Sequence, residues 1–271
     1  VTLAVDNADI AEAAGVATFT ATLSAPSALP VTVDLSFSGT AALTHDYTRS
    51  GVQITIPAGA STGSVTVTAV QDLLDENNET VVVDIASVTN GTELGAQQAT
   101  TTITDDDDAP TVTLAVDNAN IAEAAGVATF TATLSAPSAL PVTVDLSFSG
   151  TAALTDDYTR SGVQITIPAG STSGSVTVTA VQDAIDEDDE TVIVDIVGVV
   201  NGVESGVQQQ TTTITDDDDA PTVTLAVNNA NIAEAAGVAT FTATLSAPSA
   251  LPVTVDLSFS GTAALTDDYT R

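Results

Sequence analysis

The chain has 271 residues, a net charge of -33 and only three basic residues, all of them arginine. Such a charge excludes a nucleic-acid partner, because phosphates would be repelled, and it argues against docking on an anionic membrane. A hydrophobic fraction of 44% excludes a disordered acidic tail, and zero cysteines exclude disulfide and thiolate chemistry. No apolar run approaches the ~18 residues of a membrane span, so we expect no membrane insertion in this fragment and any targeting signal outside it.

The first part of the chain predicts short strands and no helix. Between Ala17 and Leu23, apolar residues alternate with threonine, and Val31–Phe37 repeats the pattern with polar residues between the apolar ones. A period of two is typical of a strand with one buried face. Proline, glycine and asparagine mark the turns between such runs. Seven strands are predicted, at residues 1–5, 17–23, 31–37, 52–56, 65–70, 81–85 and 100–104.

The sequence that begins at Val1 recurs with few changes at Val112 and again at Val223, which gives a repeat with a period of 111 residues. This period is too long for a solenoid repeat and suits one β-sandwich domain. We therefore predict an all-β fold of tandem seven-stranded, Ig-like antiparallel sandwiches at 1–110 and 111–221, with the first half of a third at 222–271. Either the array continues beyond that half or another chain completes it; we expect the first.

Acidic residues fall in the loops that share one pole of such a sandwich. Glu12 follows the first predicted strand, Asp46 the third, the stretch 72–79 the fifth, and four consecutive aspartates, 105–108, the seventh. Two unit charges about 5 Å apart repel by roughly 0.8 kcal/mol even in water. Carboxylates from four distant segments at one pole therefore predict a bound cation at the junction between units.

Calcium is the cation that this residue set favours, because it takes six to eight oxygen ligands. Zinc or copper would need histidine or cysteine ligands, and the chain has one histidine and no cysteine. The alternative is a solvated acidic surface, which is the interpretation we give Asp34, Asp84 and Glu93. We expect Arg49 and Arg160 to form ion pairs with neighbouring carboxylates.

Four pieces of each complete repeat resemble the Calx-beta domain family. In the first repeat they are IAEAAG at 10–15, DYT at 46–48, DLLDENNETVVVDI at 72–85 and TITDDDD at 102–108. Where the family often has paired acids at the head of the third piece, this chain has Gln71 before Asp72, which puts one ligand in doubt. The resemblance implies a calcium-binding Ig-like sandwich. Such domains occur in cytosolic calcium sensors of sodium/calcium exchangers and in tandem arrays of bacterial surface adhesins.

The resemblance also implies the calcium ligands by position. Glu79 and Glu190 are weaker candidates, because a residue that opens a strand can instead cap or orient the loop. The third copy retains only Glu234 and Asp268, so its site should be incomplete. The implied ligands in the two complete repeats are Glu12, Asp46, Asp72, Glu76, Asp105, Asp106 and Asp107, and then Glu123, Asp157, Asp183, Glu187, Asp216, Asp217 and Asp218.

Near-identical copies, the lack of cysteine and the high acidity favour the adhesin setting. The function predicted is a calcium-stiffened extender of a large secreted or cell-surface bacterial adhesin, outside the cell, whose partners are calcium ions and neighbouring repeats. The alternative is a subunit of an extracellular filament or sheath, with other copies as partners. A calcium sensor is least favoured, because no output domain is visible. We expect no enzyme, since no nucleophile–base pair or aromatic pocket is present.

Overall fold

The computed structural model describes residues 1–271, which form strands and no helix. All seven runs predicted for the first repeat are strands, and two three-residue strands, β2 and β5, join them. These two lack a long alternating pattern and were missed for that reason. The strands of the first repeat, which we call unit 1, are β1 (Thr2–Val5), β2 (Asp9–Ala11), β3 (Val16–Thr22), β4 (Val31–Gly39), β5 (Tyr47–Arg49), β6 (Gln53–Ile56), β7 (Thr62–Ala69), β8 (Glu79–Thr89) and β9 (Gln98–Thr104).

Unit 1 is a sandwich of two sheets. One sheet has four strands in the order β1-β3-β7-β5, and the other has five in the order β2-β9-β8-β4-β6. Every pairing is antiparallel except that of β2 with β9, which is parallel and sets Ile10 opposite Ile103. The short strand β2 therefore runs alongside the last strand of the unit, in the same direction.

The alternating pattern fills the space between the two sheets. Phe19, Val33, Val67 and Val83 are fully buried, while the threonines between such residues face outwards. Burying one such side chain contributes roughly 1.5–3 kcal/mol. The core is therefore built from β-branched and aromatic side chains on every second position of the long strands, as the period of two predicts.

The second repeat, unit 2, repeats this arrangement and adds one two-residue strand, β18. Its sheets have the orders β14-β16-β12-β10-β18 and β11-β19-β17-β13-β15. A separate core, with Phe130, Val144, Val178 and Val194 fully buried, lies between them. The strands are β10 (Thr111–Val116), β11 (Asn120–Ala122), β12 (Val127–Leu134), β13 (Val142–Gly150), β14 (Tyr158–Arg160), β15 (Gln164–Ile167), β16 (Ser173–Ala180), β17 (Glu190–Val200), β18 (Val203–Glu204) and β19 (Gln209–Thr215).

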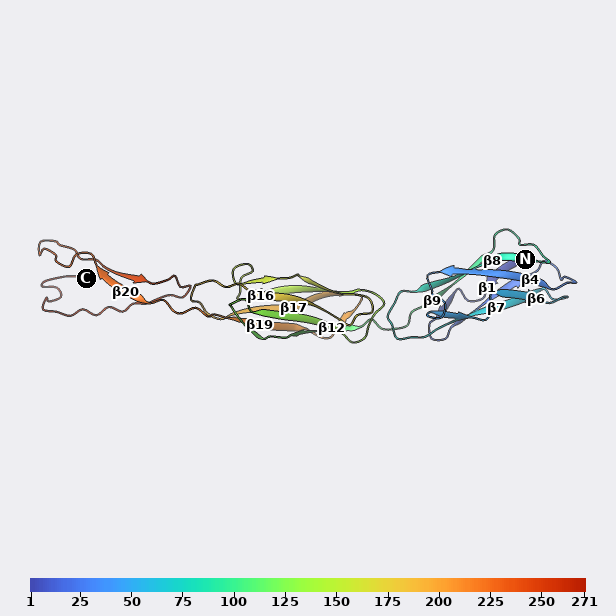
Figure 1. Ribbon diagram of the computed structural model, residues 1–271, viewed down its shortest axis with the longest axis horizontal. Coiled ribbons are helices and arrows are strands. Elements are labelled where there is room, and N and C mark those ends of the chain that lie inside the picture. The colour runs from blue at the N-terminus through green and yellow to red at the C-terminus, as the bar shows by residue number, and fades with distance from the viewer.

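The units lie end to end along one long axis, with the third copy beyond unit 2 (Figure 1). The third copy contains only β20 (Val223–Val227) and β21 (Phe241–Leu245), which pair with each other. Phe241 is 52% exposed, whereas the equivalent Phe19 and Phe130 are fully buried. A helix of the length and apolarity needed to cross a bilayer is not found in the fold.

Candidate metal centre

Glu12 reaches the pole of unit 1 because β2 runs parallel to β9. The Glu12 N–H donates a hydrogen bond to the Thr104 carbonyl at 3.0 Å, so its backbone is fixed beside the last residue of β9. The aspartates of 105–108 follow directly on the chain. The pairing of two strands that are about ninety residues apart thus brings the first acid next to the last four.

Asp46 reaches the same pole through a tight turn ahead of β5. Its side chain accepts a hydrogen bond from the Ala42 N–H, and its carbonyl accepts one from the Val70 N–H at 2.9 Å. Thr44 in this turn has a φ of 77°, a conformation that costs a non-glycine residue energy. The bond to Val70 ties Asp46 to the point where β7 ends and the acidic loop begins.

The loop between β7 and β8, residues 70–78, carries the third set of acids. The Asp72 N–H donates to Oε1 of Glu12 at 2.9 Å, and Oδ1 of Asp72 accepts from the Leu74 N–H at 2.8 Å. At the other end of the loop, Oδ1 of Asn78 accepts from the Asp105 N–H at 3.1 Å. Hydrogen bonds to the segments on both sides therefore hold the loop in the cluster.

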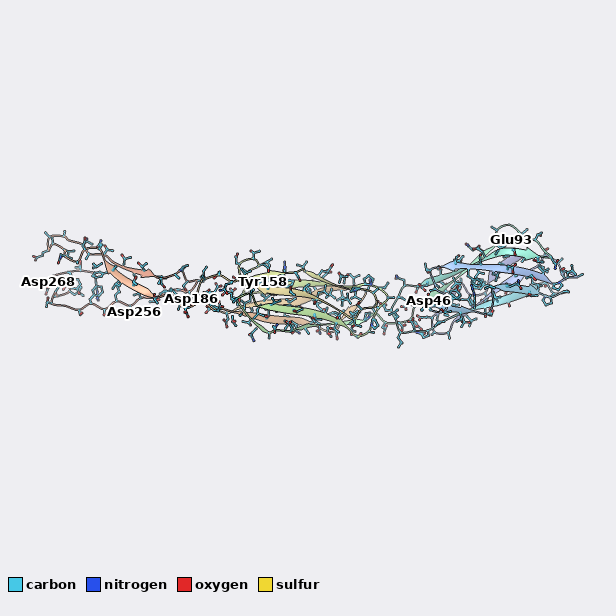
Figure 2. The ribbon with its side chains drawn as sticks, viewed as in Figure 1. Asp46, Glu93, Tyr158, Asp186, Asp256 and Asp268 are labelled. Carbon is cyan, nitrogen blue, oxygen red and sulfur yellow. The ribbon has the colours of Figure 1, made fainter.

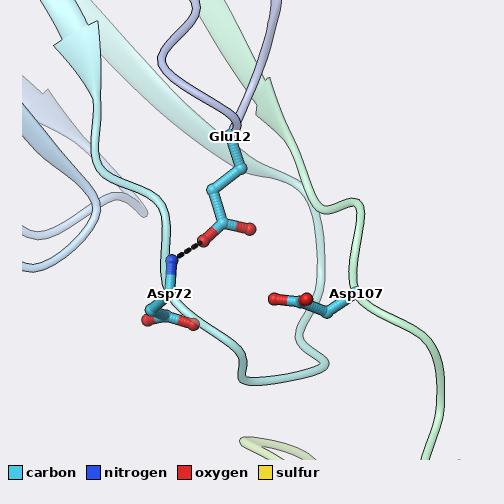
Figure 3. Close-up of side chains that lie close together, drawn as sticks. All are labelled: Glu12, Asp72 and Asp107. Carbon is cyan, nitrogen blue, oxygen red and sulfur yellow. Dashed lines mark hydrogen bonds between the residues drawn. The ribbon is translucent and has the colours of Figure 1, made fainter.

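The carboxylates gather in two groups of three in each unit, and within a group the ligand-capable oxygens lie within 4.8 Å of one another. The Glu12 group takes its members from the loops after β2, β7 and β9 (Figure 3). The Asp46 group uses the turn before β5 and the acidic loop as far as the first residue of β8. The groups of unit 1 are Glu12, Asp72 and Asp107, and Asp46, Glu76 and Glu79; those of unit 2 are Glu123, Asp183 and Asp218, and Asp157, Glu187 and Glu190.

Several oxygens of these groups are buried and lack a hydrogen-bond partner. Glu12 is only 3% exposed, and its Oε2 has no partner. Oε2 of Glu79 and Oδ2 of Asp107 are likewise buried atoms without a partner, and so are Oδ1 of the neighbouring Asp105 and the equivalent atoms of unit 2. A buried polar atom without a partner costs free energy, more when it is charged. These atoms therefore fit a site that a cation completes.

The electrostatics of the cluster favour a positive ligand as well. Burial, together with a hydrogen bond to Asp46 and the negative charge of that residue, raises the pKa of Glu79 to about 8. Burial and the charges of Asp46 and Asp72 raise the pKa of Glu76 to about 7. Burial also raises the pKa of Glu12, with the charges of Asp72 and Asp107 adding to the effect. A divalent cation would reverse each of these penalties.

No basic residue neutralises the cluster. The Arg49 guanidinium lies over the Phe37 ring, 4.3 Å from its centroid, and Arg160 lies over Phe148 at 4.5 Å. The prediction that these arginines form ion pairs with carboxylates is therefore wrong. Each guanidinium makes a cation–π contact with a phenylalanine ring instead.

In unit 2 the acids line a small pocket of about 10 Å³, with Val181 and Ile214 in its wall.

The structure brings most of the predicted ligands of each unit together, and one of the weaker candidates joins them in each unit. Glu79, a weaker candidate, lies inside the Asp46 group. Asp105 lies beside both groups, where its charge raises the pKa of Glu12 and of Glu76. Asp106 is exposed and accepts a hydrogen bond from Gln71 at 3.1 Å, outside both groups. Its equivalent in unit 2, Asp217, accepts one from Gln182 at 3.0 Å; Asp216 keeps a buried oxygen without a partner.

The two candidate ligands of the third copy lie on exposed segments. Glu234 and Asp268 are both exposed, and neither belongs to a group of three. Figure 2 shows Asp268 near the far end of the third copy, whereas Asp46 lies at the end of unit 1 that faces unit 2. Both groups of three thus occur in each complete unit, at the end from which the chain leaves.

One contact residue of the acidic loop has no signal in the sequence. Asp75 lies among the other acids of the loop, but its carboxylate is turned towards unit 2, where it accepts a hydrogen bond from the Ser138 hydroxyl at 2.9 Å. Ser138 belongs to a turn bracketed by prolines, and nothing in that turn marks it as a contact between units. Only the placement of one unit against the next reveals the pair.

Solved structures that match the chain include three described with the name Calx. CBD12 from CALX1.2 is 14% identical, over 79% of this chain and 99% of that one, with a TM-score of 0.36. The calcium binding domain CBD12 of CALX1.1 is 12% identical, over 73% and 81%, also at 0.36. The apo form of the Calx CBD1 domain is 18% identical, over 40% and 99%, at 0.35. No protein with a curated description matches the chain.

The family comparison covers the whole sequence. The model of the Calx-beta domain matches residues 1–107, 105–218 and 216–271, one match for each copy of the repeat. These matches include every acidic segment described above. The chain therefore belongs to the Calx-beta domain family, as a tandem array of its β-sandwich domain.

Proposed function

We propose that the chain is a calcium-stiffened extender of a large adhesin that is secreted or displayed on the bacterial cell surface. The observation that carries this proposal is the position of the two carboxylate groups, at the end of each complete unit that faces the next one (Figure 2). At that place a bound cation acts on the junction as well as on the unit itself.

Calcium suits the donor set, which consists of carboxylate oxygens from four loops and turns with no nitrogen or sulfur ligand among them. Calcium bound there would supply positive charge and take up the free coordination of the buried oxygens. In this proposal the Glu12 group, the Asp46 group and Asp105 hold the cations of unit 1, and the equivalent residues hold those of unit 2. The separation into two groups supports at least two cations per unit.

The stiffening follows from how short the connection between units is. Only Ala109 and Pro110 separate the last aspartate from Thr111, the first residue of β10. Proline fixes its own φ and restricts the residue before it. Pro110 is also buried, and its carbonyl accepts a hydrogen bond from the Val203 N–H at 3.0 Å. Once the repulsion between the loops is neutralised, such a junction has little freedom to bend.

The adhesin assignment and the location outside the cell rest on several properties of the chain. The repeats are nearly identical and lie in a row, an arrangement that adds length without adding a new binding surface. Extracellular calcium modules typically bind with dissociation constants of 0.1–1 mM, which extracellular fluids saturate and cytosol does not. Antibody labelling of intact cells that make the protein tests the location: surface label supports it, and label only after permeabilisation contradicts it.

Calcium titration of the chain tests the metal. Isothermal titration calorimetry on metal-free protein should show at least two calcium ions per complete unit, with sub-millimolar to millimolar affinity. Small-angle scattering in the same buffer should give a longer maximum dimension with calcium than with EDTA. Magnesium is the control, because it prefers a small octahedral site and retains its water. Equal scattering curves with calcium and EDTA would contradict the proposal.

The alternative is a subunit of an assembled filament, in which copies of the chain contact one another. Light scattering across a concentration series separates the two functions: a monodisperse monomer supports the extender, and growth into fibres supports the filament.

A further inference from the structure

Asp75 lies between two residues of the candidate metal centre but does not face it. Asp72 belongs to the Glu12 group and Glu76 to the Asp46 group, whereas the Asp75 carboxylate contacts the turn of unit 2 at Ser138. The Ser138 hydroxyl lies 2.9 Å from Oδ2 of Asp75 and 3.1 Å from its carbonyl oxygen. The Ala139 N–H donates to the same carbonyl at 3.0 Å. One residue of unit 1 thus makes a small bridge, with side chain and backbone, to unit 2.

The next junction repeats this contact atom for atom. The Ser249 hydroxyl donates to Oδ2 of Asp186 at 2.8 Å, and the Ala250 N–H donates to the Asp186 carbonyl at 3.0 Å. Figure 2 shows Asp186 between unit 2 and the third copy. The second junction therefore has the same geometry as the first.

The burial of the serine shows that the contact is a fitted surface. Ser138 is 1% exposed, while Ser27, its equivalent in unit 1, is partly exposed. Both serines make the same local bond: the Leu29 N–H donates to Ser27 Oγ at 3.1 Å, and the Leu140 N–H to Ser138 Oγ at 3.0 Å. What distinguishes Ser138 is therefore only the loop of unit 1 that covers it.

The covalent linker is the other point of attachment at this junction, and its far end is fixed on unit 2. The Val203 N–H donates to the Pro110 carbonyl, and within unit 2 Thr111 pairs with Val203 and Val112 with Glu204 in a short parallel ladder. Two units joined at one point pivot freely about it. Two points of attachment leave only rotation about the line between them, so a second contact changes the stiffness of the junction.

We propose that Asp75 and Asp186 are docking residues, not calcium ligands, and that the turns at Ser138 and Ser249 are the surfaces that receive the metal loop of the preceding repeat. The partner that this surface fits is the acidic loop tip of another copy of the same domain. The loop is then shared: cations held by Asp72 and Glu76 position the residue between them, and that residue fixes the next unit. This inference rests on the proposed function in one respect, the calcium that orders the loop.

The chain offers a matched pair of variants to test the contact. Ser138→Ala removes the local bond to Leu140 and the bond to Asp75, while Ser27→Ala removes only the equivalent local bond to Leu29. Because the chain has no cysteine, Thr55→Cys with Thr166→Cys gives a unique pair of spin labels, on exposed, equivalent positions of units 1 and 2. Pulsed electron spin resonance then reports the distribution of distances between the units.

With saturating calcium, Ser138→Ala should broaden the distance distribution about twofold, and Ser27→Ala should leave it at the reference width. Calcium affinity should be unchanged in both. Equal widths for the two variants would overturn the docking role while leaving calcium stiffening intact. If the unmodified chain binds no calcium, the proposed function fails, and the same two variants in metal-free protein decide whether the contact exists without it.

A second variant separates docking from ligation and avoids any effect of the serine on folding. Asp75→Ala removes both side-chain oxygens and so the bond from the Ser138 hydroxyl; a docking residue should lose less than twofold in calcium affinity while the distance distribution broadens. A calcium ligand would instead lose at least tenfold in affinity. That second result would overturn the assignment of Asp75, and the same comparison at Asp186 checks it independently.

Discussion

Oε1 of Glu12 accepts a hydrogen bond from the backbone N–H of Asp72, 2.9 Å away, although the two residues are separated by 60 positions in the sequence. The bond places a nearly buried carboxylate against the head of the acidic loop, and its other oxygen has no partner. The equivalent bond in unit 2, from Asp183 to Glu123, is 2.8 Å long. In each complete unit, a hydrogen bond from the backbone therefore holds the site in place, although the carboxylates of the site repel one another.

Removal of calcium should lower the melting temperature sharply. A ligand at 100 times its dissociation constant stabilises a fold by about 2.7 kcal/mol per site, which for two sites in a domain of this size corresponds to a fall of at least ~20 °C. Differential scanning calorimetry with calcium and with EDTA measures this, with magnesium as the control. A melting temperature that is the same in both buffers would mean that the carboxylates bind no calcium.

Two adjacent aspartates should differ in their effect on calcium binding. Asp107→Asn removes a charge from the Glu12 group and should weaken binding at least tenfold, about 1.4 kcal/mol. Asp106→Asn is the matched control, because this residue is exposed and bonds only Gln71, and it should change affinity less than twofold. Calorimetric titration of both variants checks the difference. Equal losses would indicate a diffuse ion atmosphere instead of a defined site.

Glu12→Gln should have opposite effects with and without calcium. Without metal, the buried carboxylate has its pKa raised by burial, so its charge destabilises the folded unit at neutral pH. The amide removes that charge and should raise the melting temperature of unit 1 in EDTA by a few degrees. With calcium the same variant loses a ligand and should melt below the unmodified chain. A melting temperature in calcium that is unchanged or higher would exclude a ligand role for Glu12.

The metal-free protein should become less stable as the pH rises from about 5 to 8.5. The pKa of Glu76 is raised to about 7 and that of Glu79 to about 8, so between the ordinary value of 4.5 and these values the folded state binds more protons than the unfolded state. Stability contributed by such protons is present at low pH and is lost as the pH passes through the raised values. We expect the melting temperature to fall across this range, which calorimetry on the protein in EDTA at a series of pH values measures.

Calcium should invert that pH dependence, because protons compete for the same carboxylates. In millimolar calcium the melting temperature should rise between pH 5 and 8. The control is a variant with glutamine at both glutamates of the Asp46 group in each unit, Glu76→Gln, Glu79→Gln, Glu187→Gln and Glu190→Gln, which should flatten the metal-free profile. An unchanged slope in this variant would place the titrating groups elsewhere in the chain.

The fold was predictable because one simple rule governs most of it. Alternation of apolar and polar residues indicates the long strands, and the internal sequence repeat indicates the units. The short strand β2 escaped prediction since three residues carry too little periodicity, yet its pairing with β9 is what brings Glu12 to the pole. The unit boundaries at residues 110 and 221 stay a prediction, which limited proteolysis at the two Ala-Pro linkers would test.

The convergence of the acids was also predictable, because alternate loops of an antiparallel sandwich share one end. The orientation of single side chains within the cluster was not. Asp105, Asp106 and Asp107 are consecutive, and the sequence offers no reason why the middle residue bonds Gln71 while its neighbours keep buried free oxygens. The Asp105 N–H donates a hydrogen bond to Oδ1 of Asn78, which fixes Asp105 beside the acidic loop, and nothing in the sequence indicates this contact.

The parallel pairing of β2 with β9 has a mechanical consequence. The chain enters each unit near one end and leaves it at the other, so tension along the row pulls these two neighbours in opposite directions. The hydrogen bonds between them, from Thr102 to Ala8 at 2.8 Å and from Glu12 to Thr104 at 3.0 Å, are then strained in shear and must break together. A pair pulled apart from one end would instead break bond by bond, at lower force. The rupture force of a unit, measured by pulling single molecules, is therefore set at the same strand whose end carries Glu12.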